Sequence, residues 1–378
     1  MKVRLGDYIQ EYSVKNKDDE NISVYSVTNT KGFCKDYFGK EVASKDKTTY
    51  KIVPYGYFAY NPSRINVGSV DWQRKEKKVI VSPLYNVFSV SPNLERQYLY
   101  YYLKSDFVLQ RIKAVATGSV RDNLKLSMLY EFPIELPKLE NQRKIVKILD
   151  KVSDVVEKKE QELEQLDTFV KSRFAEMFGD PIQNPYNWSI KSLLEMGYCK
   201  NGMNFHTGDS GIELYCLGVG DFKDYSIIDG TDQLSKISLN EMPPEESMLQ
   251  NGDIVFVRSN GNKDLVGRCV LVYPHDVQTT YSGFCIRYRL TSREVNKNYL
   301  LCVLKTDSMR KQMTGRGANI QNLNQKTLAT LNIPIPPIEL QNQFADFVVS
   351  TDKSKSKIQK SLEETQLLFD SLMQKYFG

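Results

Sequence analysis

The sequence repeats itself at an offset of 199 residues, the distance from Gly118 to Gly317, and this repeat constrains the fold more than any other feature. At that offset residues 117–179 align with 316–378 without a gap. Identical residues at equivalent positions include Gly118/Gly317, Asn123/Asn322, Gln142/Gln341 and Phe178/Phe377. The front parts of the two halves diverge. A repeat of this kind predicts one structural scaffold used twice, with two different recognition surfaces; neutral drift of the front parts is the other interpretation.

The back part of each copy has the pattern of a long amphipathic helix. From Glu140 to Phe178 there is no glycine or proline, and apolar residues recur at spacings of mainly three and four, at Ile145, Leu149, Val152, Val156, Leu163, Leu166, Val170 and Met177. The second copy has the equivalent seam at Phe344, Val348, Ile358, Leu362, Phe369, Leu372 and Tyr376.

Each predicted helix would extend about 55–60 Å, which exceeds a domain diameter, so its apolar stripe needs a partner. Polar residues interrupt both seams, at Lys159 in the first and Lys355 in the second. These gaps disfavour a long homodimeric coiled coil and favour antiparallel pairing of the two helices within one chain. Homodimerisation remains the alternative.

The front parts mix predicted strands with helices. Alternating or continuous apolar runs predict strands at 50–53, 57–60 and 78–81 in the first copy, and at 253–258, 267–272 and 284–289 in the second. One helix is expected near 98–115 and another near 297–314. The fold class is therefore α+β with a pseudo-two-fold repeat: a recognition domain at 1–133, a helix at 134–179, a second domain at 180–332 and a second helix at 333–378.

The loops after these strands carry side chains suited to DNA. Arginine pairs with guanine, asparagine and glutamine pair with adenine, and serine bonds phosphates. On this basis the candidate DNA-binding residues are Tyr60, Asn61, Ser63, Arg64, Asn66, Arg121, Asn123, Arg258, Ser259, Asn260, Asn262, Arg268, Arg316, Asn319, Gln321 and Asn322. By composition alone, such polar loops are also typical of ordinary solvated turns.

Catalytic and metal-binding signatures are weak or missing in the sequence. The net charge of +5 permits nucleic-acid binding without requiring it. The six cysteines form no C-x-x-C pair, no phosphate-binding G-K-[ST] motif occurs, and Gly218–Asp221 lacks the third glycine of a dinucleotide fingerprint. Asp71 with Glu76 and Lys78 is only a faint nuclease-like grouping. We therefore predict no catalytic residue, no metal and no cofactor.

Nothing in the sequence predicts a membrane protein. The first residues, Met1–Asp7, contain no apolar signal core, and no stretch approaches the length of a membrane span. We expect a cytoplasmic protein with reduced cysteines.

Several segments together resemble the specificity (S) subunits of type I restriction–modification systems. The segment 136–146, with the sequence LPKLENQRKIV, and the segment 335–341, with the sequence IPPIELQ, are similar to the motif that precedes the conserved helices of that family. Residues 178–188 resemble the junction into the family's second half, and residues 58–64 and 251–258 resemble its target recognition domains. The family usually has glutamate where this chain has Asn141 and Leu340.

The resemblance implies a circular molecule in which two target recognition domains each read half of a split DNA target. The antiparallel helices would then set the length of the unspecified spacer. It also implies partners: double-stranded DNA, two methyltransferase (modification) subunits and restriction subunits. S-adenosylmethionine, magnesium and ATP would belong to those partners.

Two other classes of protein remain open at this stage. One is a self-contained DNA nuclease or methyltransferase with a degenerate core, which would cut or methylate DNA unaided. The other is a coiled-coil scaffold that binds only protein; it would be indifferent to loss of charge at Arg64, Arg258 and Arg268.

Overall fold

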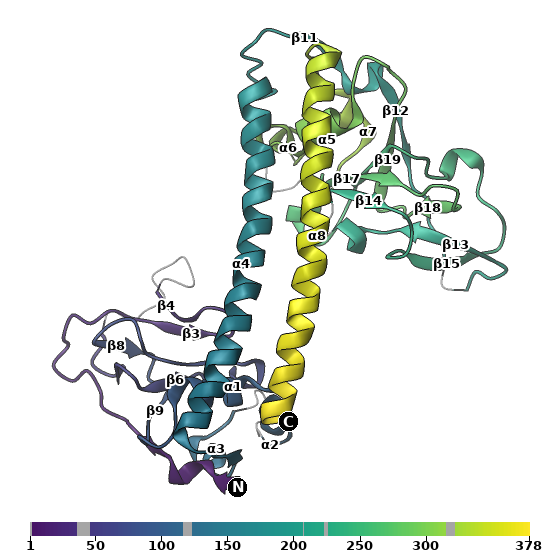
Figure 1. Ribbon diagram of the computed structural model, residues 1–378. Helices are drawn as coiled ribbons and strands as arrows, with labels where there is room; N and C mark the ends of the chain where they lie inside the picture. Colours follow the sequence, from purple (N-terminus) through teal and green to yellow (C-terminus); the bar gives the residue numbers. More distant parts are fainter. Residues whose placement is uncertain (1, 36–45, 116–122, 207, 223–225, 315–321) are drawn as a thin grey trace. The chain divides into compact units, whose positions relative to one another are not determined.

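The computed structural model describes residues 2–35, 46–115, 123–206, 208–222, 226–314 and 322–378. The chain forms two compact units (Figure 1). Unit 1 comprises Met1–Gln161 and Gln359–Gly378, and unit 2 comprises Glu162–Ile358. Each unit therefore contains one recognition domain and one part of each long helix, a division that runs across the four consecutive segments expected from the sequence.

The two long helices are α4 (Leu139–Phe178) and α8 (Ile338–Phe377), each of 40 residues and so about 60 Å long. In unit 1 the first part of α4 packs against the last part of α8. Leu149 shares a core with Met373 and Phe377, whereas Lys159, further along α4, bonds Ser361, which is earlier in α8. The two segments therefore run antiparallel.

Unit 2 contains the corresponding antiparallel pair, made by the last part of α4 and the first part of α8. The rings of Phe178 and Phe344 lie 5.4 Å apart, and those of Phe169 and Phe347 lie 5.1 Å apart. The antiparallel pairing predicted from the seams is thus confirmed within each unit.

The polar gaps of the seams are hydrogen-bonded layers. In unit 1 the Lys159 ammonium donates to the Ser361 carbonyl (3.0 Å), to the Ser361 hydroxyl and to the Thr365 hydroxyl (3.0 Å). In unit 2 Lys355 forms an ion pair with Asp167 and lies 3.7 Å from Asp352. A half-buried ammonium needs such partners, so both lysines are compatible with the helix pairing.

The recognition domain of unit 1 is built on a four-stranded antiparallel sheet with the order β2-β9-β6-β7. One face, with Phe58 and Phe88, packs against the helices; the other, with Ala59 and Val87, packs against the remaining strands. The elements are β1 (Lys2–Arg4), β2 (Ile9–Glu11), β3 (Ser26–Thr28), β4 (Gly32–Cys34), β5 (Lys51–Pro54), β6 (Phe58–Tyr60), β7 (Val70–Trp72), β8 (Lys78–Val81), β9 (Asn86–Val90), α1 (Arg96–Lys104), α2 (Asp106–Val115), α3 (Leu126–Tyr130) and β10 (Pro133–Glu135).

The domain of unit 2 repeats this sheet as β12-β19-β16-β17 and extends it with β14, which is parallel to β17. Ile254 and Phe256 face the helices, while Val255 and Val257 face a second core. The elements are β11 (Ser189–Ser192), β12 (Gly197–Asn201), β13 (Ile212–Leu217), β14 (Ile227–Asp229), β15 (Ser235–Leu239), β16 (Asp253–Val257), β17 (Cys269–Tyr273), β18 (Thr279–Tyr281), β19 (Cys285–Leu290), α5 (Lys297–Lys305), α6 (Asp307–Thr314), α7 (Gln325–Ala329) and β20 (Asn332–Ile335).

The six predicted strands are confirmed with small shifts of their ends, but the helices expected near 98–115 and 297–314 are each two helices. The break falls at Ser105 in unit 1 and Thr306 in unit 2, both with extended backbone. The Ser105 hydroxyl donates to Tyr102 O (2.8 Å) and the Thr306 hydroxyl to Val303 O (2.8 Å). The same hydroxyls accept from Val108 N and Met309 N of the following helices, each at 3.4 Å. Each hydroxyl therefore ends one helix and begins the next.

Within the described parts of the chain, no helix is long and apolar enough to cross a lipid bilayer.

Candidate nucleic-acid interface

In unit 1, the loop after β6 is held in shape by some of the residues predicted to contact DNA. The Asn61 side-chain oxygen accepts hydrogen bonds from the Ser63 backbone N–H (3.1 Å) and from the Ser63 hydroxyl (3.0 Å). Gly68 ends the following turn with a φ of 83°, a conformation that favours glycine. Arg64 is exposed and Asn66 is half-buried, so Arg64 is the cation this loop offers to a ligand.

Tyr60 has a different place from the one the sequence indicated. Its side chain is fully buried, and its hydroxyl donates to the Leu124 carbonyl at 3.1 Å. Burial raises its pKa, so the hydroxyl stays protonated as a donor. Tyr60 therefore supports the loop from within the core, and its side chain is not available to a ligand.

In unit 2, the loop after β16 is similarly self-supporting. The Asn260 side-chain oxygen accepts from the Asn262 N–H (2.8 Å), and the Asn262 side-chain oxygen accepts from the Asp264 N–H (3.0 Å). Arg258 is half-buried, and its Nη1 donates to the Gly283 carbonyl at 3.3 Å. Arg268, also half-buried, precedes β17 directly.

The same backbone bond joins two candidate loops in each unit. Leu124 N donates to Pro62 O (3.1 Å) in unit 1, and Leu323 N donates to Arg258 O (2.7 Å) in unit 2. In unit 2 a β-bridge between Ser259 and Asn322 adds to this junction. The bond brings Asn123 beside the loop after β6, and Asn322 beside the loop after β16. Arg121, Arg316, Asn319 and Gln321, which the sequence also indicated, lie outside the described residues.

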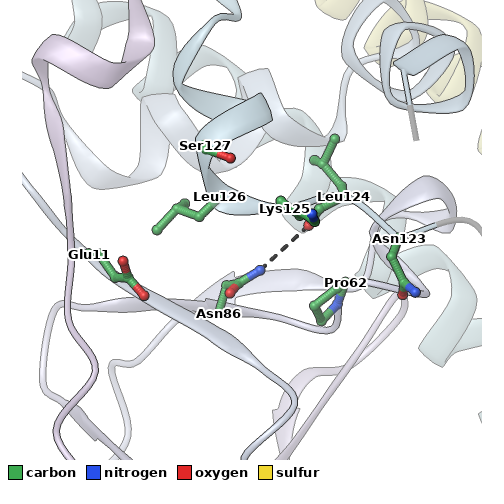
Figure 2. Close-up of a pocket in the computed structure, with 8 residues that line it drawn as sticks. All are labelled: Glu11, Pro62, Asn86, Asn123, Leu124, Lys125, Leu126 and Ser127. Carbon is green, nitrogen blue, oxygen red and sulfur yellow. Dashed lines mark hydrogen bonds between the residues drawn. The ribbon is translucent and has the colours of Figure 1, made fainter. Parts of the chain in front are cut away.

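A cavity of about 330 Å³ lies beside the junction in unit 1 (Figure 2). Carboxylate, amide, hydroxyl and ammonium groups line it, so it offers both donors and acceptors to a polar ligand. The Asn86 amide nitrogen donates to Leu124 O at 3.5 Å. The lining residues are Glu11, Pro62, Asn86, Asn123, Leu124, Lys125, Leu126 and Ser127. Of these, the sequence indicated only Asn123. Lys125, two residues further along the same loop, could have been found by its position alone.

The acidic and basic side chains around Asp71 serve the fold. Asp71 is buried and accepts from Phe33 N (3.1 Å) and Trp72 N (2.8 Å), and burial raises its pKa. Glu76, which lies near the surface, bonds Tyr25 and Lys35, and its pKa is lowered mainly by the hydrogen bond from Lys35. Among the described residues no group of three or more histidine, cysteine, aspartate or glutamate side chains is placed to hold a metal ion. The arrangement is that of a structural network.

The long helices expose apolar side chains that their mutual packing leaves uncovered. In unit 1 these include Leu367 and Leu368 of α8 and Val155 of α4; in unit 2 they include Phe169 of α4 and Val349 of α8. Exposed apolar side chains mark a protein-binding surface where they form a contiguous patch, and Leu367 and Leu368 are adjacent in the sequence.

A scaffold that occurs twice in one chain, with different polar side chains at the same loop junction, is typical of a protein with two separate recognition sites. Comparison with known proteins gives the family. The family described as "Type I restriction modification DNA specificity domain" matches residues 3–168 and 223–365. The chain belongs to this family.

Individual relatives agree with this assignment. The chain is 25% identical over 312 residues to the type I restriction enzyme StySPI specificity subunit of Salmonella potsdam, and the match covers 76% of this chain and 65% of that protein. It is 22% identical over 394 residues to the MjaVIII specificity subunit of Methanocaldococcus jannaschii, covering 95% and 89%. The chain thus spans less than two thirds of the Salmonella protein.

The fold is also similar to the crystal structure of a type I restriction–modification S subunit from M. genitalium. The TM-score is 0.58 at 16% identity, and the match covers 100% of this chain and 96% of that one. At this level of identity the likeness shows the fold alone.

Proposed function

We propose that the chain is the DNA sequence-specificity subunit of a type I restriction–modification complex. The recognition domain in unit 1 would read one half of a bipartite DNA target, and the domain in unit 2 the other half. The observation that carries the proposal is the duplicated junction: the same sheet and the same backbone bond present Arg64 and Asn123 in one unit, and Arg258, Ser259 and Asn322 in the other. Equal scaffolds with unequal side chains are what reading two different sequences requires.

We assign two roles to the long helices. They would act as a spacer between the two readers and as the surface on which two methyltransferase subunits dock. The exposed apolar residues Val155, Leu367 and Leu368 in unit 1 and Phe169 and Val349 in unit 2 support this docking. Restriction subunits would join the assembly through those partners, in the cytoplasm where the DNA is.

Chemistry, in this proposal, belongs to the partners. The acidic residue most suggestive of a nuclease, Asp71, is engaged by backbone N–H groups and Arg74. The chain would therefore act as a non-catalytic subunit, with the methyl donor, magnesium and ATP bound by the methyltransferase and restriction subunits.

Methylome sequencing of a host that carries this chain with its methyltransferase subunit tests the proposal. The expected result is a split motif, two short specified sequences separated by an unspecified spacer. A continuous motif would contradict it, as would purified chain that methylates or cleaves DNA without a partner.

Charge-removing changes at the loop junctions test which residues read DNA. Replacement of Arg64 or Arg258 by alanine should weaken target binding by the assembled complex by about 1–3 kcal/mol if the side chain contacts a base. The change at Arg64 should relax one half of the motif and the change at Arg258 the other half. A matched control is Lys151→Ala, on the exposed surface of α4. Unchanged site-specific binding by both arginine variants would favour a scaffold that binds only protein.

A further inference from the structure

Each long helix carries a fully buried glutamine in its first turn. Gln142 is the fourth residue of α4 and Gln341 is the fourth residue of α8, and both side chains have no solvent exposure. A buried amide costs free energy unless its donors and acceptor are all used.

In unit 1 the Gln142 amide bonds the recognition domain and the segment that leads into α4. Its Oε1 accepts from the backbone N–H of Glu95 at 2.8 Å, and its Nε2 donates to Asn93 O at 3.0 Å and to Pro137 O at 2.8 Å. Asn93 and Glu95 belong to the turn between β9 and α1, and Glu95 occupies the position directly before the first helical residue of α1. Pro137 belongs to the segment that leads from β10 into α4.

In unit 2 the Gln341 amide makes the same three bonds to equivalent atoms. Its Oε1 accepts from Asn296 N at 2.8 Å, and its Nε2 donates to Glu294 O at 3.0 Å and to Pro336 O at 2.7 Å. Asn296 is the N-cap residue of α5, as Glu95 is of α1, although only the Asn296 side chain makes a capping bond, from Asn298 N. The bonded groups are all backbone atoms, so the arrangement persists although the turn is Asn-Leu-Glu in one unit and Glu-Val-Asn in the other.

Three directional bonds to two segments fix an angle, which apolar contacts alone do not. The buried Leu94 and Val295 in the two turns contribute non-directional burial, whereas hydrogen bonds weaken steeply away from their preferred geometry. At each junction the glutamine therefore opposes rotation of the turn, and of the helix it caps, about the start of the long helix.

We infer that Gln142 and Gln341 are positioning residues that set the angle at which each recognition domain is carried on its long helix. Through that angle they set how sharply the complex discriminates between spacer lengths in a split target. This inference rests on the proposed function. One base pair more or less in the spacer moves a half-site by about 3.4 Å and turns it by roughly 35°, so a domain held at a fixed angle meets only one of these positions without strain.

The experiment measures methylation by the complete complex of this chain and its methyltransferase subunits. The DNA substrates carry the natural spacer, or a spacer one base pair shorter or longer. The variants are Gln142→Met and Gln341→Met, which keep the length of the side chain and remove all three bonds. The control is Gln161→Met in α4, where the exposed side chain bonds Glu157 of its own helix.

The measured quantity is the ratio of the methylation rate on the natural spacer to the rate on an altered spacer. We expect this ratio to fall about tenfold in each junction variant, the factor that corresponds to the net contribution of one hydrogen bond. The control variant should keep the wild-type ratio. If the junction variants slow methylation of all substrates in proportion and keep the ratio, the glutamines only stabilise the fold and the inference is overturned.

A milder variant decides the matter if the methionine variants do not assemble. Gln142→Asn keeps the amide but is one methylene too short to reach all three partners, so we expect a smaller fall in the ratio; an unchanged ratio in an assembled complex would overturn the inference. Wild-type complex that shows no spacer preference would instead contradict the proposed function itself. The two failures are therefore distinguishable.

Discussion

The last helical residue of the chain, Phe377, should be a core residue of the first recognition domain. Its side chain is only 6% exposed, and its ring lies 5.0 Å from that of Tyr98 and 6.3 Å from that of Tyr102, both in α1. Replacing a buried phenylalanine by alanine costs about 3–5 kcal/mol through lost burial and the cavity left behind. For a unit of this size each kcal/mol lowers Tm by roughly 2–4 °C, so Phe377→Ala should lower the Tm of unit 1 by about 6–20 °C.

Differential scanning calorimetry of the full chain measures this shift. The matched control is Leu367→Ala in the same helix, because Leu367 is 69% exposed; its effect should stay within about 0.5 kcal/mol. An effect of Phe377→Ala no larger than that of the control would refute the reasoning that the C-terminal part of α8 completes the core of unit 1.

Three further changes test other parts of the account. Asp253→Ala removes the buried partner of Arg289, whose guanidinium makes two bonds of 2.8 Å to that carboxylate. In urea unfolding, the free energy of unfolding of unit 2 should fall by about 3–5 kcal/mol. A fall below about 1 kcal/mol would contradict the assignment of a buried ion pair. Burial lowers the pKa of Lys305, so the unfolded chain binds this proton more tightly and unit 2 should gain stability as pH rises from the lowered folded pKa towards the unfolded value of about 10.4. Lys305→Met should flatten that slope in denaturant titrations between pH 7 and 10, and an unchanged slope would assign it to other groups. Leu368→Asp, at a side chain 51% exposed, should weaken assembly with methyltransferase subunits at least about tenfold in sedimentation analysis while leaving Tm unchanged; full assembly would remove this face from the docking surface.

The long helices could be predicted because their signal is local and strong. The absence of glycine and proline between Glu140 and Phe178 and the apolar seam define α4 almost to the residue. The lysines in the seams also favoured pairing of the two helices within one chain over a long homodimer. Their partners, Ser361 and Thr365 for Lys159 and Asp167 for Lys355, depend on which residues face each other across two helices and therefore appear only in the structure.

The junctions and the site were harder to predict because they depend on contacts between distant segments. The break at Ser105 is a single hydroxyl that bonds the preceding turn, and a helical apolar pattern continues through it. Tyr60 ends a strand and precedes polar residues, so it was grouped with them in the sequence, whereas β-sheet pairing turns its side chain into the core. The roles of Gln142 and Gln341 were visible in the sequence only as an identity between the two copies.

Exchange of one recognition domain tests the central claim most directly. Residues 186–332 would be replaced by the equivalent segment of a relative with a different target, and the methylome of a host carrying the hybrid and its methyltransferase subunit would be sequenced. We expect a split motif in which the half read by the exchanged domain changes, while the half read by the first domain is retained. A motif that is unchanged, or that changes in both halves, would contradict the assignment of one reader to each unit.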